Sequence, residues 1–122
     1  MKSIVSLRDV LYYDDYYGDG EMIRMMFAHA DYKYTDIRLN SNDRALFLEN
    51  QPLNKLPCVM HKLEKEYYWC GNAILRMYGI KLGYYVSLSD NTNHMWQIDS
   101  AVEYISDCTN TILTTINESQ FF

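Results

Sequence analysis

The sequence predicts a mixed α/β domain, built in the order βαβ and then ββα, that is followed by one long helix. Three observations support this prediction. Two β-prone runs flank a helix-periodic segment near the start, and two more surround a charged turn in the middle. Apolar residues then recur at steps of three and four residues through the last part of the chain. A chain of 122 residues is the size of one domain with a single core.

The first half of the sheet is expected from the βαβ segment. Val10 to Tyr13 is a short apolar, β-prone run, which Asp14-Asp15 and a turn with two glycines close. From Glu21 to about Ala30 the apolar residues change to helical spacing. Residues 33–39 alternate polar and apolar, as a half-buried strand does. The polar stretch 40–50 is expected to be irregular or to form a short helix.

The second half is expected from the ββα segment and the helix after it. Residues 58–60 and 67–69 read as two strands joined by the charged hairpin 62–66, and a helix that opens near Gly71 stops at Gly83. The last helix is expected from about 94 to 116, with an apolar stripe of Met95, Ile98, Val102, Ile105, Thr109, Ile112 and Ile116. The helices of the two units should cover the faces of a small mixed sheet.

Composition and charge limit the classes of partner. Eleven Lys and Arg against 16 Asp and Glu leave a net charge of −5, which argues against a nucleic-acid partner. The apolar runs are shorter than the ~20 residues that cross a bilayer, so no transmembrane segment is expected. Because the start of the chain turns acidic early, a cytoplasmic location is the default expectation, with an organellar assembly as the alternative. The three cysteines lack C-x-x-C spacing and are expected to be reduced thiols.

Three blocks of the sequence resemble the amino-terminal, thioredoxin-fold domain of the glutathione S-transferases. Residues 11–13 with 17–24 are similar to that family's strand tyrosine and its R-G-R-A-E-P-I-R signature. Residues 54–57 resemble its G-Q-L-P motif, whose proline is cis, and residues 72–76 resemble the S-N-A-I-L-R start of its third helix. The resemblance covers residues 10–83 and points to the tyrosine-type classes (sigma, alpha, mu and pi).

The resemblance implies a thioredoxin-like fold and a set of site residues. Tyr13 takes the position of the tyrosine that stabilises the glutathione thiolate, with Tyr12 as the alternative one residue earlier. Glutathione-binding positions fall on Lys55, Leu56, Pro57 and Gly71. Asp107 falls near an acidic residue that, in the family, reaches the glutathione of the neighbouring subunit. A structural role for each tyrosine in its strand, and a solvated helix-face role for Asp107, are the competing interpretations.

Two departures from the family pattern bear on activity. The Gln-Ser pair that holds the γ-glutamyl end is replaced by Cys70-Gly71, which we expect to cost ~3 kcal/mol or more of glutathione affinity. The all-helical second domain is represented by one helix, so the expected division is a domain over 1–84, a linker over 85–93 and a helix remnant over 94–122. The apolar stripe of that helix must be buried by folding back, by a second copy or by another protein.

The sequence therefore favours a degenerate transferase-like domain that acts as a non-catalytic scaffold or accessory subunit. Its expected partner is another protein subunit or a second copy, bound through the C-terminal helix. The alternative is a minimal glutathione-binding transferase that is active as a dimer, with glutathione as a substrate. No cofactor is expected, and no metal site, because His29, His61 and His94 lack ligand spacing.

Overall fold

The computed structural model, which describes residues 7–86 and 92–119, confirms the predicted order of strands and helices. Over these residues the elements are β1 (Val10–Asp14), α1 (Asp19–His29), β2 (Thr35–Leu39), α2 (Ser41–Glu49), β3 (Cys58–His61), β4 (Glu66–Trp69), α3 (Gly71–Leu82) and α4 (Thr92–Ser119). Of the predicted linker 85–93, residues 87–91 lie outside the described residues. The division into a domain and a helix remnant stays a prediction.

The four strands form one mixed sheet in the order β2-β1-β3-β4. β1 pairs with β2 in parallel, through the α1 crossover, and with β3 in antiparallel fashion. β3 and β4 form the antiparallel hairpin that the charged turn predicted. This arrangement is the thioredoxin-like sheet, so the predicted fold class is confirmed.

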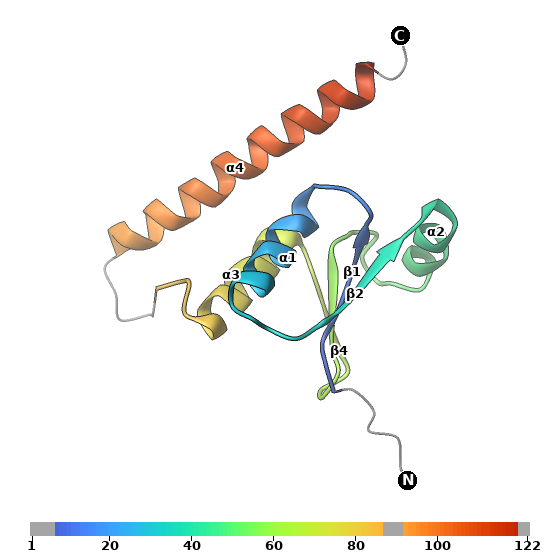
Figure 1. The fold of residues 1–122 in the computed structure, drawn as a ribbon, viewed down its shortest axis with the longest axis horizontal. Helices are drawn as coiled ribbons and strands as arrows, with labels where there is room; N and C mark the ends of the chain where they lie inside the picture. The colour runs from blue at the N-terminus through green and yellow to red at the C-terminus, as the bar shows by residue number, and fades with distance from the viewer. Residues whose placement is uncertain (1–6, 87–91, 120–122) are drawn as a thin grey trace.

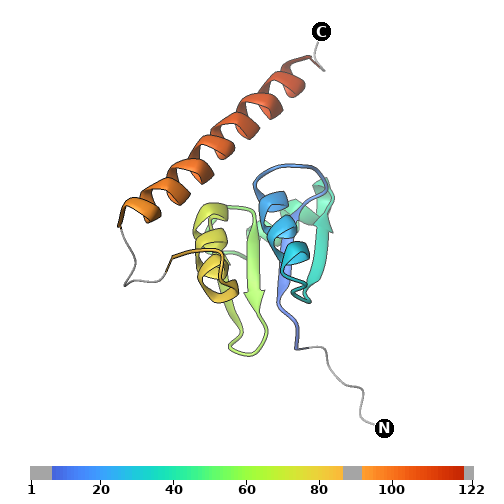
Figure 2. The ribbon, with the colours of Figure 1, turned by 60° about the vertical axis from the view of Figure 1, so that its left-hand side comes forward.

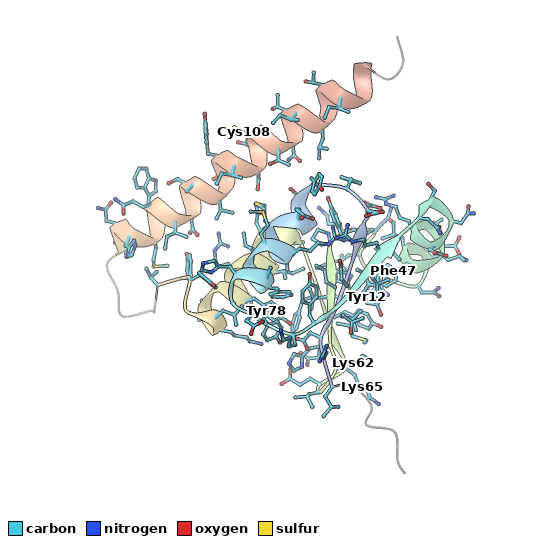
Figure 3. The ribbon with its side chains drawn as sticks, in the orientation of Figure 1. Tyr12, Phe47, Lys62, Lys65, Tyr78 and Cys108 are labelled. Atoms are coloured by element: carbon cyan, nitrogen blue, oxygen red, sulfur yellow. The ribbon has the colours of Figure 1, made fainter. Side chains whose placement is uncertain are left out.

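The core lies between the sheet and the helices α1 and α3. Successive residues of a strand point to opposite faces, and Leu11 and Val59 are fully buried on the face that these helices cover. Phe27 of α1 and Tyr78 of α3 complete this core, with ring centroids 5.0 Å apart in an edge-to-face arrangement. α2 covers part of the opposite face, where Phe47 stacks on Tyr12 (Figures 1 and 3).

Local signals explain where two of the helices begin and end. The side chain of Asn40 accepts a hydrogen bond from the N–H of Asp43 at 2.9 Å and so caps α2, and of the two predicted alternatives for 40–50 the short helix is the one observed. α3 ends at Gly83, whose left-handed backbone (φ 84°) suits glycine, and the N–H of Tyr84 then returns to the carbonyl of Gly79.

α4 lies on the side of α1 and α3, away from the sheet (Figures 1 and 2). It is tied to α3 at Asp99, which bonds to Arg76, and at Ser106, which donates a hydrogen bond to Asn72 at 3.2 Å. Ile105 and Ile112 of the predicted apolar stripe remain exposed. The stripe is therefore covered only along part of its length within the described residues.

Candidate functional site

The residues of the predicted glutathione site meet where α3 begins. The Leu56–Pro57 bond is cis, as the motif predicted, and Pro57 is fully buried. Gly71 opens α3 directly beside it, since a Cβ at Gly71 would lie 3.3 Å from the ring of Pro57 and 3.4 Å from the Cβ of Asp19. The start of β3, the start of α1 and the start of α3 thus converge on one point.

Cys70, which precedes Gly71, has a backbone conformation that non-glycine residues rarely adopt. Its φ is 70° and its ψ is 105°, and its side chain makes no capping hydrogen bond to α3. Such conformations cost of order 1–3 kcal/mol and cluster at binding sites. The first turn of α3 therefore presents backbone N–H groups without a side-chain cap, an arrangement that favours an anion.

Tyr13 lies in the same region but is enclosed. Only 4% of its surface is exposed, and its ring packs flat against Gly20 at the start of α1. A Cβ added at Gly20 would overlap the ring, and one added at Gly18 would overlap the hydroxyl group. Above the ring stands the guanidinium of Arg24, 5.4 Å from its centroid. The tyrosine occupies space that a side chain at position 20 would otherwise take.

The environment of the Tyr13 hydroxyl opposes its ionisation. Burial is the largest cause that raises the pKa of Tyr13, and a hydrogen bond with Tyr16 raises it further, whereas a bond with the backbone of Gly20 lowers it. Tyr12, the alternative candidate, points to the opposite face of the sheet, where its ring lies 4.5 Å from that of Phe47. Burial also raises the pKa of Tyr12. No lysine or arginine is among the causes that act on the pKa of either phenol.

Arg24, which stands over Tyr13, is itself held in place by acidic groups. It is almost fully buried and pairs with Asp36 at 3.0 Å and with Glu21 at 3.3 Å. It also donates a hydrogen bond to the carbonyl of Asp14 at 3.2 Å. Because its charge is already compensated, Arg24 is a structural residue of the α1–β2 contact and not a free cation for a substrate.

An acidic cleft opens beside the start of α3. It has a volume of about 480 Å³ and extends from Asp19 and Asn72 to α4. Asp107, one of the predicted site residues, lies on its α4 wall, together with Asp99 and Glu103. The guanidinium of Arg76 also borders this cleft, but it is bonded to Asp99 at 3.1 Å. The cleft therefore carries an excess of negative charge.

The structure brings together only some of the predicted site residues. Pro57 and Gly71 are adjacent, and Asp107 lies across the cleft from the start of α1. Leu56 is half-buried, and the side chain of Lys55 is exposed. Tyr13 is beneath the β1–α1 loop, with its hydroxyl at Gly18. The roles that the resemblance assigns to these six residues stay predictions.

Two features of this region were not predicted, although the residue types at positions 19 and 20 indicate them. Asp19 stands at the second arginine of the family's R-G-R-A-E-P-I-R signature, so the charge is reversed at the mouth of the cleft. Gly20 stands at the alanine of the same signature, and the missing methyl group is what admits the ring of Tyr13. Nothing in the sequence indicates the positive φ of Cys70, because cysteine does not favour that conformation.

The sheet order and the cis proline beside α3 define a thioredoxin-like domain. In comparison with solved structures, the chain has the glutathione S-transferase fold. It matches Na-GST-3, a monomeric glutathione S-transferase from the hookworm Necator americanus, with a TM-score of 0.75 and 24% identity, over 93% of this chain and 53% of that one. It matches the glutathione S-transferase of Ascaris lumbricoides with a TM-score of 0.69 and 27% identity, over 82% and 46%.

A third match is prostaglandin synthase D of Nilaparvata lugens, with a TM-score of 0.71 and 23% identity, over 88% of this chain and 51% of that one. The chain thus spans about half the length of the proteins that it matches. No protein-family model and no curated protein matches the sequence. At these identities the matches establish the fold, while the chemistry of the site must be judged from the residues present.

Two searches of the described residues bear on other functions. Across 7–86 and 92–119, no three or more His, Cys, Asp or Glu side chains are grouped so that they could hold a metal ion. Over the same ranges, none of the helices combines the length and the apolar character that a membrane span needs.

Proposed function

We propose that this chain is a glutathione-transferase-like domain that does not activate glutathione and that serves as a non-catalytic scaffold or accessory subunit. The observation that carries the proposal is the enclosure of Tyr13 beneath Gly18 and Gly20. A tyrosine that stabilises a thiolate must bring its hydroxyl hydrogen within bonding reach of the sulfur. With 4% of its surface exposed and its hydroxyl packed at Gly18, Tyr13 offers little surface for contact with a thiol.

The charge of the cleft supports the same proposal. Glutathione carries more carboxylate than ammonium charge, so a site for it needs an excess of hydrogen-bond donors and cations. Here Asp19, Glu103 and Asp107 line the cleft, and Arg76 is already paired with Asp99. The Gln-Ser pair that would hold the γ-glutamyl carboxylate is Cys70-Gly71. Repulsion between like charges in a partly desolvated cleft weakens binding of such an anion.

The proposal that this chain binds another protein as a scaffold or accessory subunit rests on α4. On surface that α3 does not cover, this helix exposes Tyr104, Ile105 and Ile112. An exposed apolar strip of this kind is typical of a surface that another protein covers. Na-GST-3, which has the same fold, is described as monomeric, so the fold as such does not require self-association.

Calorimetric titration with glutathione tests the proposal directly. We expect the wild-type chain to give no saturable heat up to millimolar glutathione. A variant with Asp19→Arg, Cys70→Gln and Gly71→Ser restores the cation and the two side chains of the family pattern, and it is expected to gain measurable affinity. Gly71→Ser alone should strain the contact with Pro57, because the Cβ distance of 3.3 Å is already short.

The alternative, a minimal transferase, is favoured by one specific observation. The cis Leu56–Pro57 bond and the uncapped first turn of α3 preserve backbone groups that could hold a peptide and a carboxylate. Submillimolar binding of glutathione by the wild type, lost in Tyr13→Phe or Lys55→Ala but kept in Tyr12→Phe, would establish that alternative and end the scaffold proposal.

A further inference from the structure

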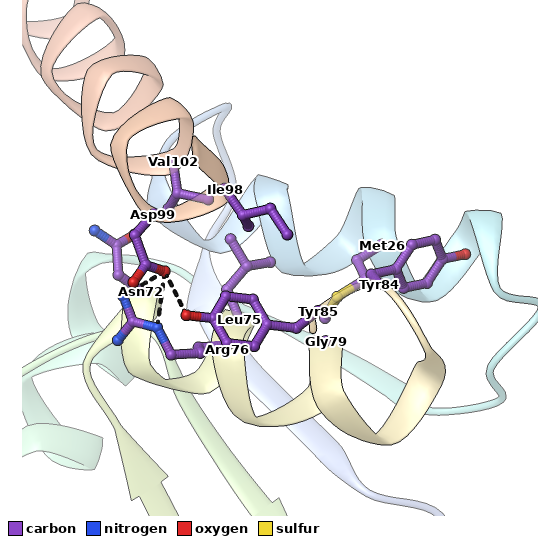
Figure 4. Close-up of a pocket in the computed structure, with 10 residues that line it drawn as sticks. All are labelled: Met26, Asn72, Leu75, Arg76, Gly79, Tyr84, Tyr85, Ile98, Asp99 and Val102. Atoms are coloured by element: carbon purple, nitrogen blue, oxygen red, sulfur yellow. Dashed lines mark hydrogen bonds and ion pairs between the residues drawn. The ribbon is translucent and has the colours of Figure 1, made fainter. Parts of the chain in front are cut away.

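A second cavity, different in character from the acidic cleft, lies between α3 and α4 (Figure 4). Its volume is about 250 Å³. Met26 of α1 and Leu75 of α3 form one side, and Ile98 and Val102 of α4 form the other. The wall of this cavity is therefore mainly apolar, although it lies beside a strongly acidic surface.

A glycine inside α3 helps to form the cavity. Gly79 is buried, and in a helix interior glycine is about 1 kcal/mol less favourable than alanine. A Cβ at this position would lie 3.5 Å from the Cβ of Tyr85, which is an ordinary contact, so backbone geometry and close packing do not require glycine here. The missing side chain instead leaves space in the wall.

The polar side chains at the cavity already have partners within the protein. Asp99 accepts hydrogen bonds from Arg76 and, at 2.9 Å, from the hydroxyl of Tyr85, and these bonds are drawn in Figure 4. The hydroxyl of Tyr84 is bonded to His29. Asn72 accepts a hydrogen bond from Ser106. A charged ligand would have to break one of these interactions in order to be neutralised, whereas a neutral ligand would not.

From this lining we propose that the cavity between α3 and α4 binds a small, neutral aromatic molecule of one or two rings. The volume sets the size, because an engineered apolar cavity of about 150 Å³ holds a single benzene. The two tyrosine rings and the thioether of Met26 favour an aromatic occupant, since rings and sulfur make favourable contacts with a ring. The apolar lining with few polar groups is the usual composition of a small-molecule site.

The proposed site does not depend on the fate of the glutathione site. The acidic cleft and the apolar cavity share a border formed by Asn72, Arg76, Asp99 and Val102. Leu75, Gly79 and Ile98 line the apolar cavity and not the cleft, so loss or retention of glutathione chemistry at Tyr13 would change nothing in the walls that they form.

Indole is a suitable probe, and heteronuclear NMR titration of the full chain is a suitable measurement. We expect saturable shifts centred on the amides of Leu75, Gly79 and Val102, with a Kd of about 0.1–1 mM for a ligand of this size. The anion indole-3-acetate should bind several-fold more weakly, because it brings a charge into an apolar wall beside Asp99.

Two variants that fill the cavity from opposite sides provide the decisive comparison. Val102→Trp and Gly79→Leu should each weaken indole binding at least tenfold, whereas Ala101→Trp, which adds the same side chain on the exposed surface of α4, should leave the Kd unchanged. Circular dichroism shows whether each variant is folded. Absence of saturable shifts in the wild type would overturn the proposal. Equal weakening by Ala101→Trp, or tighter binding of the anion than of indole, would overturn it as well.

Discussion

Gly20 decides how Tyr13 is placed. The glycine lies in the first turn of α1, where its missing Cβ admits the tyrosine ring, and Gly18 leaves room for the hydroxyl in the same way. Burial then raises the pKa of Tyr13 and removes its hydroxyl from solvent. The missing methyl group at position 20 thus allows the ring of Tyr13 to be enclosed in the core.

We expect Gly20→Ala to destabilise the protein by about 1–3 kcal/mol, because the new methyl group overlaps the buried ring. Urea denaturation measures this change. In a Tyr13→Ala background the same substitution should be neutral or slightly stabilising, because the clash is gone and alanine favours the helix. Equal costs of Gly20→Ala in both backgrounds would contradict the proposed packing of Tyr13.

Asp9 organises a second buried cluster of tyrosines. Its carboxylate, only 4% exposed, accepts hydrogen bonds from Tyr32 at 2.7 Å and from Tyr78. Burial, and after it the bond to Asp9, raises the pKa of Tyr32 to about 12 and raises that of Tyr78 further. The unfolded chain loses these protons near pH 10, before the folded one does. Their contribution to stability is therefore complete below pH 10 and is lost as the pH rises above it.

Urea midpoints measured from about pH 8 to about pH 11 are thus expected to fall above pH 10. The double variant Tyr32→Phe, Tyr78→Phe should lose part of this slope. Tyr104→Phe, in which the ring is exposed on α4, should retain it. A midpoint that stays constant up to pH 11 would show that the two phenols ionise as easily in the folded state as in the unfolded one.

At the scale of the elements, α4 is the helix with the least internal support. It spans Thr92–Ser119, and its described contacts with α3 centre on Asp99 and Ser106. Arg76 and Tyr85 both bond to Asp99, so this carboxylate connects α4 to two segments. An isolated helix in water is marginal without such docking.

We therefore expect Asp99→Ala to lower the hydrogen-exchange protection of α4 by about two- to fivefold, since an exposed ion pair contributes about 1 kcal/mol or less. Protection in β1 should not change, because none of its interactions involves this residue. Glu103→Ala, on the same helix, is the matched control and should leave α4 as protected as in the wild type. Loss of protection in the control would point to a general effect of acidic residues on the helix.

At the scale of the whole molecule, two surfaces differ in chemistry. The cleft beside α3 is acidic, whereas the distal part of α4 exposes Tyr104, Ile105 and Ile112. Figure 3 shows α4 standing clear of the β3–β4 turn, where Lys62 and Lys65 lie. Within the described residues, the apolar strip formed by Tyr104, Ile105 and Ile112 is exposed on both sides of Ser106 and is accessible to a partner.

We expect concentration-dependent self-association of the chain in sedimentation equilibrium, because this strip gains free energy when it leaves water. Ile112→Glu should weaken the association about tenfold or more, as a buried isoleucine is worth about 1.5–3 kcal/mol. Thr111→Glu adds the same charge on an adjacent exposed position and should have a much smaller effect. A wild type that is monomeric at every concentration would exclude self-association and leave a different protein as the partner.

The positions of the elements could be predicted from the sequence, since they depend on local patterns. Alternation over 33–39, helical spacing after Glu21 and a glycine after α3 were sufficient to place a strand, a helix and a helix end. The one indefinite stretch, 40–50, became a helix because Asn40 caps it. The motif around Pro57 also predicted the cis bond correctly.

What the sequence by itself determined is the order of strands and helices, the apolar period of α4 and the residue types at each site position. Only the tertiary structure decided that Tyr13 is enclosed, that Asp19 and Asp107 face one cleft, and that an apolar cavity lies between α3 and α4. The physical reason is the distance along the chain over which each effect acts. Periodicity and capping act within a few residues of one another, whereas enclosure and clustered charge arise from segments that meet only when the chain has folded.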